Sequence, residues 1–452
     1  MITQATEIVP NAGWCWYQGP RTIVDSANGN VIFSSIASGE GVDGDSVGGD
    51  VQVTTWNPAT HEAQTVKVGH FDGDDHDVAA LWERPDGRYL VVYTCHNHGW
   101  SDKQPKSFYR ISTHPHDATD WQDEQVFSWP TTEPIGNGIV SVTYSNLFHL
   151  TEEGGDNGVL YNIARASGQL WRIATSDDWG ETWTLRGILS LPPEGGRAYS
   201  NGYTQYATNS KDRIDFTITQ AHPRDYNNGV YHGYIHNGQT HDANGNVLDP
   251  ETFSEQAPLP EDFTPLFKPE QPADGAYHTG WTIDLTRCPD DSLHALFSCR
   301  VGVESVSREP LIRKDLRNPL GDADHRLFYG KLVDGAWQTT ELCKMGIGLY
   351  DNESDYVGLG AIDPIDGQTL YVSTPIDPRD GLPIHRHELF KATTPDGGQT
   401  WDWEPITEQS VHDNLRPQVV ALPNGRRALL WLRGRYWTMH KWDQQAVGLI
   451  LD

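Results

Sequence analysis

The sequence is poor in basic residues, has few methionines and contains no long apolar run. Lysine and arginine total 33 against 62 acidic residues, which gives a formal net charge of −29 over 452 residues. Because duplex nucleic acids are bound through basic faces, this balance argues against a nucleic-acid partner. The longest apolar runs are far shorter than the roughly 18 residues that a membrane-spanning helix needs, so we expect no membrane association.

Targeting and disulfide signals are also scarce. Residues 1–7 have neither the basic nor the apolar region of a signal peptide. We therefore expect a secreted or periplasmic protein whose signal peptide is absent from this chain, or a cytoplasmic protein if Met1 is the native start. The five cysteines are odd in number and widely spread. Buried free thiols are expected, in preference to a disulfide between Cys288 and Cys299.

Turn-forming and aromatic residues are abundant. The chain has 44 Gly, 28 Pro, 17 Trp and 18 Tyr, and short apolar runs such as residues 89–93, 158–163 and 369–373 recur between Asp-Gly, Asn-Gly and Gly-Gly turns. No amphipathic helical pattern extends beyond about ten residues. These features predict an all-β chain.

Two segments repeat one turn pattern. Residues 176–183 and 394–401 both fit S/T-x-D-x-G-x-T-W, the Asp-box hairpin between outer strands of a propeller blade. At roughly 50–65 residues a blade, the chain length predicts a seven-bladed β-propeller that is a single domain over residues 1–452. The segment from Leu415 to Leu432 would complete the ring together with the N-terminal strand.

Polar residues at the ends of apolar strands are the candidates for a site at the mouth of the channel. His76 lies between aspartates before one strand, and His96 ends the next. Tyr144 and Arg165 come from the two runs that follow, and a strand-end guanidinium needs a carboxylate from protein or ligand. A lone histidine is more often structural and Arg165 could form an inter-blade ion pair. Two histidines on consecutive strands of one blade place the functional interpretation about level with the structural one.

Further candidates rest on weaker grounds. His98 follows His96 with the same parity, beyond the end of the strand. Tyr206 and Arg224 could contact a sugar, although buried aromatics and turn arginines are commoner. Later in the chain, the segments around His278 and Arg326 offer additional residues that could face the channel.

The order of these motifs resembles that of the BNR-4-repeat proteins, a group that includes seven-bladed propeller ulvan lyases and lyases acting on rhamnosyl-glucuronate linkages. The resemblance is carried by residues 13–18, the His76/His96 segment, residues 144–148, residues 222–224, residues 413–417 and residues 430–436. It covers essentially the whole chain, is fairly specific for the family and does not fix the substrate.

The resemblance implies catalytic roles for His76, His96, Tyr144 and Arg165, and a substrate contact for Tyr206. His278 and Arg326 are matched to a further pocket histidine and arginine of the fungal rhamnose–glucuronate enzymes. The longer spacing between Tyr144 and Arg165 is ascribed to a polar hairpin at residues 152–157. No cofactor is required for the chemistry, although some relatives hold a supporting calcium or zinc ion, for which no ligand set can be placed here.

β-Elimination on a 4-linked uronic acid would suit these residue types. Arg165 would stabilise the enolate that forms beside the substrate carboxylate. A histidine or Tyr144 would take the C5 proton, with Arg165 lowering the pKa of the tyrosine, and Tyr144 would protonate the leaving O4. Sequence does not order the two histidines.

We therefore expect a monomeric carbon–oxygen lyase that binds an anionic, uronate-containing polysaccharide, with ulvan as the favoured substrate. An exo-acting L-rhamnose-α-1,4-D-glucuronate lyase on gum arabic or arabinogalactan-type chains is the alternative. Two other classes stay open: a propeller glycoside hydrolase and a non-catalytic sugar-binding propeller.

Overall fold

The computed structural model describes residues 5–96, 100–132, 140–192, 202–223, 226–250, 256–269, 277–302, 324–349 and 355–452. Within these residues the chain is almost entirely β-strand, with one short α-helix, α1 (Gly44–Val47), and two 3-10 turns, η1 (Asp75–Asp77) and η2 (Pro260–Asp262). None of the described helices is long and apolar enough to cross a membrane.

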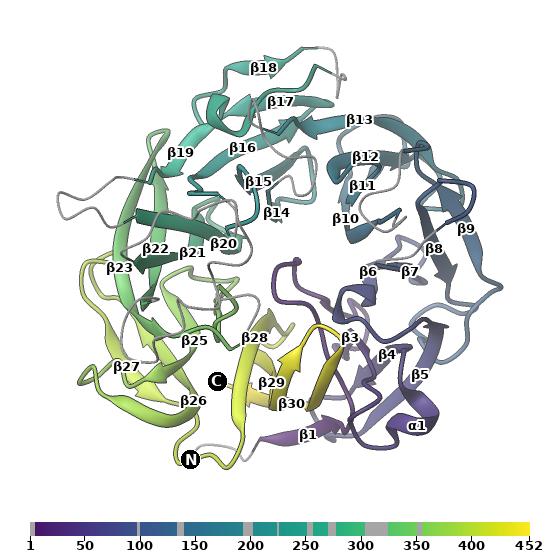
Figure 1. Ribbon diagram of the computed structural model, residues 1–452. Coiled ribbons are helices and arrows are strands. Elements are labelled where there is room, and N and C mark those ends of the chain that lie inside the picture. The colour runs from purple at the N-terminus through teal and green to yellow at the C-terminus, as the bar shows by residue number, and fades with distance from the viewer. Residues whose placement is uncertain are drawn as a thin grey trace.

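Seven antiparallel sheets stand in a ring around a central axis, so the fold is a seven-bladed β-propeller, as the sequence predicts (Figure 1). We number the blades in chain order, each with its innermost strand first. Blade 1 comprises β2 (Thr22–Val24), β3 (Val31–Ile36), β4 (Asp50–Trp56) and β5 (Ala63–His70). Blade 2 comprises β6 (Ala80–Glu83), β7 (Tyr89–Thr94), β8 (Lys106–Ile111) and β9 (Gln125–Ser128).

Blades 3 and 4 follow, and blade 4 is the one sheet of the described residues that has six strands. Blade 3 comprises β10 (Thr143–Leu150), β11 (Val159–Ala166), β12 (Leu170–Ser176) and β13 (Thr184–Ser190). Blade 4 comprises β14 (Thr204–Thr208), β15 (Arg213–Thr219), β16 (Val230–His236), β17 (Gln239–Asp242) and β18 (Val247–Asp249), with β19 (Thr264–Phe267) also paired to β16.

The last three blades return to four strands each. Blade 5 comprises β20 (Tyr277–Arg287), β21 (Leu293–Gly302), β22 (Asp324–Val333) and β23 (Ala336–Gly346). Blade 6 comprises β24 (Gly360–Ile362), β25 (Thr369–Ile376), β26 (Pro383–Thr393) and β27 (Asp402–Pro405). Blade 7 comprises β28 (Asp413–Ala421), β29 (Arg427–Thr438), β30 (Lys441–Leu451) and, on its outer edge, β1 (Thr6–Val9).

The ring is closed by strands from both ends of the chain. β1 pairs antiparallel with β30, with Thr6 opposite Gly448 and Glu7 opposite Val447. Ile8 and Val9 are buried with Trp56 in a cluster that joins blades 7 and 1. The predicted completion of the ring by an N-terminal strand is therefore observed, and this pairing covers the edge of β30 that would otherwise be open to other chains.

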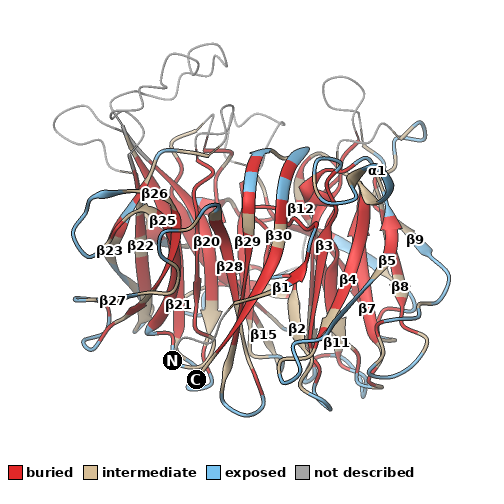
Figure 2. Ribbon diagram, turned by 90° about the horizontal axis from the view of Figure 1, so that it is seen from below, coloured by how far each residue is buried: buried red, intermediate tan, exposed pale blue. Residues whose placement is uncertain are grey.

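Burial is concentrated in the inner strands and between blades, whereas the turns at both ends of the blades are exposed (Figure 2). β3 and β7, the second strands of blades 1 and 2, are buried along their whole length because neighbouring blades cover both of their faces, so they are largely apolar without strict alternation. All five cysteines are buried free thiols, which confirms the expectation from their number and spacing.

The two repeated turns adopt one geometry. In the turn between β12 and β13, Asp178 accepts hydrogen bonds from the backbone N–H and the hydroxyl of Thr182, at 2.9 and 2.6 Å. In the turn between β26 and β27, Asp396 accepts the same two bonds from Thr400, at 2.9 and 2.6 Å. Both turns therefore connect the third and fourth strands of their blades, away from the axis.

A buried segment crosses the middle of the ring. Residues 11–19, which we call the central segment, are all buried and connect β1 of blade 7 to β2 of blade 1. The segment appears as the purple loop inside the ring in Figure 1. Trp16 packs against Tyr356 and Tyr436, and Tyr17 stacks on Trp281 at 3.4 Å between ring centroids. The central segment therefore supplies side chains to the same region as the inner strands.

Candidate active site

The sequence around His76 builds a tight turn that fixes the imidazole. Gly73 has φ of 81°, and Asp74 is the N-terminal cap of η1, its carboxylate accepting the backbone N–H of His76 at 3.0 Å. The same carboxylate oxygen lies 2.6 Å from Nδ1 of His76. His76 is only 4% exposed, so the turn holds a histidine inside the protein rather than on its surface.

His96 is held beside His76 by the same turn. Its backbone N–H donates to Asp77 Oδ1 at 2.7 Å, and its Nδ1 lies 2.7 Å from Asp74 Oδ2. The two imidazole rings stack with centroids 4.2 Å apart and an interplanar angle of 14°. The two histidines therefore come together from the start and the second strand of blade 2.

Tyr144 reaches the histidines from blade 3 through an irregularity in β10. The strand register shifts between Thr143 and Asn146, and Tyr144 has φ of 58°, a left-handed conformation that is costly for a tyrosine. Asn146 stabilises the bulge by donating its side-chain amide to the Tyr144 carbonyl at 2.6 Å. The Tyr144 ring lies 5.4 Å from that of His76, and such strain is characteristic of functional positions.

Arg165 completes the group from β11, where it pairs with Thr143. Its guanidinium carbon lies 4.7 Å from the ring centroid of Tyr144 and 5.2 Å from that of Tyr203. All four residues that the sequence singled out as catalytic, His76, His96, Tyr144 and Arg165, thus gather at the junction of blades 2 and 3.

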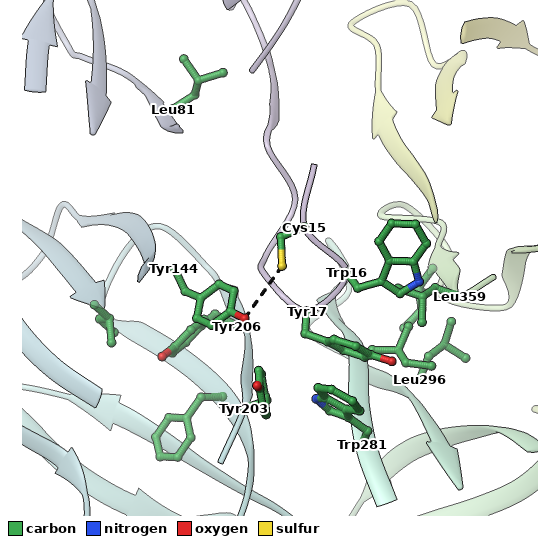
Figure 3. Packing of buried hydrophobic residues seen from close by; sticks show 14 of the residues in the cluster. Cys15, Trp16, Tyr17, Leu81, Tyr144, Tyr203, Tyr206, Trp281, Leu296 and Leu359 are labelled. Carbon is green, nitrogen blue, oxygen red and sulfur yellow. Dashed lines mark hydrogen bonds between the residues drawn. The ribbon is translucent and has the colours of Figure 1, made fainter. Parts of the chain in front are cut away.

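The central segment contributes residues that the sequence did not point to. The Cys15 thiol donates to the Tyr144 hydroxyl at 3.8 Å, and Figure 3 shows Cys15 and Tyr17 lying between Tyr144 on one side and Trp281 on the other. Tyr203 lies beside Tyr144, with ring centroids 5.9 Å apart. Tyr203 and Cys15 carried no signal in the sequence beyond their neighbours, because only the path of the central segment and of blade 4 brings them here.

The two histidines differ in protonation. Burial opposes a charge on His76, but the acidic groups around it, Cys15, Tyr144, Asp74 and Asp75, outweigh burial and hold its pKa well above 6.5. Burial lowers the pKa of His96 to about 4, with the charges on His76 and Arg165 acting in the same direction. At neutral pH the pair therefore consists of one imidazolium and one neutral imidazole.

Tyr144 does not have the lowered pKa that the sequence analysis expects. Burial, together with the nearby Cys15, raises its pKa well above 10 and outweighs the opposing effects of His76 and Arg165. Arg165 does act to lower the tyrosine pKa, as predicted, but the net shift is upward because the prediction took no account of desolvation at a residue that is 1% exposed. Tyr144 is a neutral phenol with a proton to donate.

Two more arginines lie near the axis without a carboxylate as hydrogen-bond partner in the contacts described. Arg21 donates to Asn146 and Gln18, at 3.3 and 3.1 Å. Arg416 donates to the carbonyls of Cys15 and Gln18. Burial lowers the pKa of Arg21 to about 9 and that of Arg416 to about 10, so both are charged at neutral pH. These two guanidinium groups therefore add positive charge near the axis of a strongly acidic protein.

The weaker sequence candidates have mixed outcomes. Tyr206 packs against Phe148 and Trp171 and its hydroxyl accepts a bond from Thr204 at 2.9 Å, so the other tyrosine of its motif, Tyr203, is the one beside Tyr144. Arg326 lies on β22, the third strand of blade 5, and pairs with Glu341 at 2.7 Å. The expectation that Arg326 faces the channel was wrong, because two strands separate β22 from the axis.

The remaining three candidates cannot be placed. His98 and Arg224 lie outside the described residues. His278 is in β20, the innermost strand of blade 5, but its side chain is not among those described.

The donor atoms around the histidine pair do not fit a zinc or calcium ion. Asp74, His76 and His96 bring ligand-type atoms within 4.8 Å of one another, as do Cys15, Asp75 and His76. The carboxylate oxygens, however, lie only 2.6 and 2.7 Å from the imidazole nitrogens, whereas two ligands of one tetrahedral zinc are about 3.3 Å apart. Hydrogen bonds account for the two Asp74 contacts, and calcium prefers oxygen ligands. The supporting ion stays a prediction without a site.

A surface cleft lies elsewhere, on blade 6. Its volume is about 390 Å³ and its lining includes Arg379, His385, Glu388 and Phe390, but none of the predicted site residues. The cleft on blade 6 and the cluster of candidate catalytic residues therefore lie in different places. We favour the histidine–tyrosine group as the site because the pKa shifts there give two adjacent histidines different charges, whereas the shifts in the cleft, at Asp377 and Arg379, only reinforce the ordinary charged forms of an ion pair.

Comparisons with known proteins agree with the fold. The sequence model of the family described as "BNR repeat-containing family member" matches residues 47–262. This confirms the resemblance to BNR-4-repeat propellers over slightly less than half of the chain. No protein in the curated set matches.

Solved structures extend the likeness to the whole ring. A polysaccharide lyase described as PL25 ulvan lyase has a TM-score of 0.64 at 12% identity, covering 99% of this chain and 96% of its own. A second structure of that kind, with the same values, is bound to -[GlcA(1-4)Rha3S]-. Polysaccharide lyase Uly1 has a TM-score of 0.54 at 13% identity, covering 100% of this chain and 99% of its own. At this identity the likeness concerns the fold.

Proposed function

We propose that this BNR-repeat propeller is a polysaccharide lyase that cleaves rhamnose–(1,4)–uronic acid linkages by β-elimination. The observation that carries the proposal is the meeting of three groups around Tyr144: the stacked pair of His76 and His96 on one side and Arg165 on the other. The set contains a cation for a carboxylate, a neutral base and a neutral acid within a few ångströms, which is what elimination beside a carboxylate requires.

Charge at the site would favour an anionic sugar. Arg165 and the imidazolium of His76 would bind the uronate carboxylate, and the buried Arg21 and Arg416 add to the positive potential. Such a local field can attract a polyanion even where the whole protein is acidic. During the reaction the same cations would stabilise the second negative charge that develops on the carboxylate as the enolate forms.

The proton transfers follow from the protonation states. The neutral imidazole of His96 would take the C5 proton, and the electron pair of the C5–H bond would form the C4=C5 double bond. As the C4–O4 bond breaks, Tyr144 would donate its phenolic proton to O4. The resulting tyrosinate is flanked by His76 and Arg165, which oppose the rise in its pKa. A proton returned from the imidazolium of His96, directly or through solvent, resets the site.

The substrate is proposed from chemistry and from the resemblance together. The lyase structure bound to -[GlcA(1-4)Rha3S]- has this fold, and it supports a rhamnose–uronate polymer as the first substrate to test. Ulvan is favoured, and an exo-acting lyase on terminal rhamnosyl-glucuronate of gum arabic or arabinogalactan-type chains is the second candidate. Tyr203 and His222, whose rings lie 5.4 Å apart, are placed to line the path of the sugar.

The decisive experiment compares ultraviolet absorbance with reducing-sugar release on ulvan, gum arabic and other glucuronate polymers. A lyase produces both signals, because the new C4=C5 bond is conjugated with the carboxylate. Release of sugar without the absorbance would identify a glycoside hydrolase instead. Binding without either signal would identify a non-catalytic sugar-binding propeller.

Two variants test the residues. Tyr144→Phe removes the proton donor and should lower kcat by about 10²–10⁴-fold. Arg165→Ala removes the carboxylate clamp and should cost about 10²–10³-fold in kcat/KM. Tyr109→Phe is the matched control, because it removes the hydroxyl of another buried tyrosine, bonded to the Glu181 carbonyl on the outside of blade 2. Full activity in Tyr144→Phe would end the assignment of the acid.

A further inference from the structure

One carboxylate contacts both members of the histidine pair. Asp74 Oδ1 lies 2.6 Å from Nδ1 of His76, and Asp74 Oδ2 lies 2.7 Å from Nδ1 of His96. Asp74 is 1% exposed, and the charges and hydrogen bonds of the two histidines outweigh burial and keep its pKa well below 3.8. A permanently ionised group therefore stands between two imidazoles whose rings are parallel.

We infer that Asp74 is a positioning residue that bridges the two imidazoles and, with Asp75, assigns them unequal roles: His76 is the cation that holds the substrate carboxylate, and His96 is the neutral base. The roles toward a substrate, carboxylate binding by His76 and proton abstraction by His96, rest on the proposed lyase function. The unequal charge of the two histidines is a property of the protein alone.

A second carboxylate faces only one of the two rings. Asp75 Oδ1 lies 2.7 Å from Nδ1 of His76, and its other oxygen accepts the hydroxyl of Tyr436 at 2.8 Å. Asp75 Oδ1 makes no hydrogen bond of its own, so it acts on His76 as a charge while the Nδ1 proton goes to Asp74. His76 thus faces two carboxylates, whereas His96 shares one of them and faces the cations of His76 and Arg165.

The tautomer of His96 follows from the same bridge. A carboxylate accepts hydrogen bonds but cannot donate them when ionised, so the proton of neutral His96 must sit on Nδ1. The lone pair is then on Nε2, on the side of the ring remote from Asp74. A fixed tautomer of this kind places the basic nitrogen without any further rearrangement, as in other histidines oriented by an aspartate.

Groups from several elements act on the pair, and the charge assignment takes all of them into account. From the turn itself come Asp74, Asp75 and Asp77; burial and then the charge of Asp74 raise the pKa of Asp77 well above 3.8. From other elements come Cys15 of the central segment, Tyr144 of β10, Arg165 of β11, Tyr436 of β29 through Asp75, and His440, whose Nδ1 lies 3.5 Å from Asp74 Oδ2.

The direct test is histidine NMR on the free protein with ¹⁵N-labelled imidazoles, with His76→Gln and His96→Gln used to assign the two signals. At pH 7 we expect both nitrogens of His76 protonated and only Nδ1 of His96 protonated. In Asp74→Asn the pKa of His76 should fall by about one unit or more, and His96 should populate both tautomers.

Two further variants separate the bridge from general damage. Asp75→Asn keeps an acceptor for Tyr436, and it should lower the His76 pKa while leaving the His96 tautomer unchanged. Asp77→Asn is the matched control: Asp77 contacts neither imidazole nitrogen in the bonds described, and its Oδ1 accepts the His96 backbone N–H, which an amide oxygen also does. Both imidazoles should keep their wild-type spectra in Asp77→Asn.

Activity supplies the second readout. Asp74→Asn should lower kcat by on the order of 10²-fold and move the alkaline limb of the pH profile to lower pH, because the charge on His76 is then lost earlier. Identical histidine titrations in wild type and Asp74→Asn would overturn the inference. Normal titrations with no elimination on any uronate polymer would instead sink the proposed function and leave the bridge intact.

Discussion

At the scale of single residues, the site depends on how burial and charge compete for each proton. His76 and His96 have parallel rings 4.2 Å apart, yet the pKa of one is raised and that of the other is lowered to about 4. The difference comes from which carboxylates and cations each ring faces, because both rings are withdrawn from water. Residue identity and spacing alone do not determine these protonation states.

The lowered pKa of His96 predicts a pH dependence of stability. An unfolded histidine has a pKa near 6.5, so below that value the unfolded chain binds a proton that the folded chain does not bind until about pH 4. His96 therefore destabilises the fold as the pH falls. Between pH 7 and pH 5.5 its contribution should decrease the free energy of unfolding by about 1 kcal/mol.

The measurement compares urea unfolding of wild type and His96→Gln at these two pH values. Both values lie above the sequence pI of about 4.9, near which precipitation would interfere. The difference in free energy between the two proteins should change by that amount in favour of the variant at the lower pH. An unchanged difference would show that His96 is not held with a depressed pKa.

Sequence identified the four convergent residues but not their surroundings. His96 and Arg165 each end an apolar run and His76 precedes one, whereas Tyr144 takes its role from the resemblance to the lyase family. The bridging role of Asp74 was hidden, because four aspartates occur within residues 72–77 and only the geometry of η1 tells them apart. The raised pKa of Tyr144 was missed because desolvation depends on the packing of the central segment.

At the scale of elements, the position of a strand within its blade decides whether its residues reach the axis. The sequence analysis expected Arg326 to face the channel but could not number the strands from the axis outward. Since β22 is the third strand of blade 5, its arginine pairs with Glu341 on β23 instead. The local sequence of a strand does not show how many strands separate it from the axis.

The relocation of Arg326 makes a prediction. Arg326→Ala removes an ion pair that is partly exposed, so its effect on stability should be within about 1 kcal/mol. Activity should stay within about twofold of wild type, since a surface substitution away from the site leaves the chemistry unchanged. Steady-state kinetics on the same uronate polymer as Arg165→Ala would check this. A large increase in KM would return Arg326 to the binding site.

The hairpin turns predict stability effects without effects on catalysis. Asp178 accepts the backbone N–H and the hydroxyl of Thr182, so Asp178→Ala should destabilise the protein by about 1 kcal/mol or somewhat more. Asp177→Ala is the matched control, because Asp177 is exposed in the same turn. Chemical denaturation would measure the difference, and equal stability of the two variants would contradict the role given to the Asp178 carboxylate.

At the scale of the whole molecule, the number of blades and the closure of the ring were predictable, since chain length, turn spacing and the two repeated hairpins all agree. β1 contributes to the stability of the closed ring by pairing with β30 and by packing at the junction of blades 7 and 1. Ile8 is buried at the junction of blades 7 and 1, where it contacts the cluster that contains Trp56. Disruption there opens the ring rather than one blade.

Ile8→Ala should therefore lower the free energy of unfolding by about 2–4 kcal/mol, through lost burial and the cavity that remains. Thr6→Ala on the same strand, which removes one exposed hydrogen bond to His61, should cost less than about 1 kcal/mol. Thermal unfolding followed by circular dichroism would compare them. Similar melting temperatures for the two variants would mean that β1 contributes little to holding the ring together.

The central segment has a consequence for the order of events during biosynthesis. Residues 11–19 leave the ribosome before any blade exists, yet their partners include Trp281, Tyr356, Arg416 and Tyr436. Trp14 contacts Phe33 of blade 1 and Tyr17 stacks on Trp281 of blade 5, but Trp16 does not meet Tyr436 until the seventh blade emerges. The segment precedes every blade in the chain, so part of its aromatic surface stays uncovered while the later blades are made, and co-translational chaperones are expected to matter for this propeller.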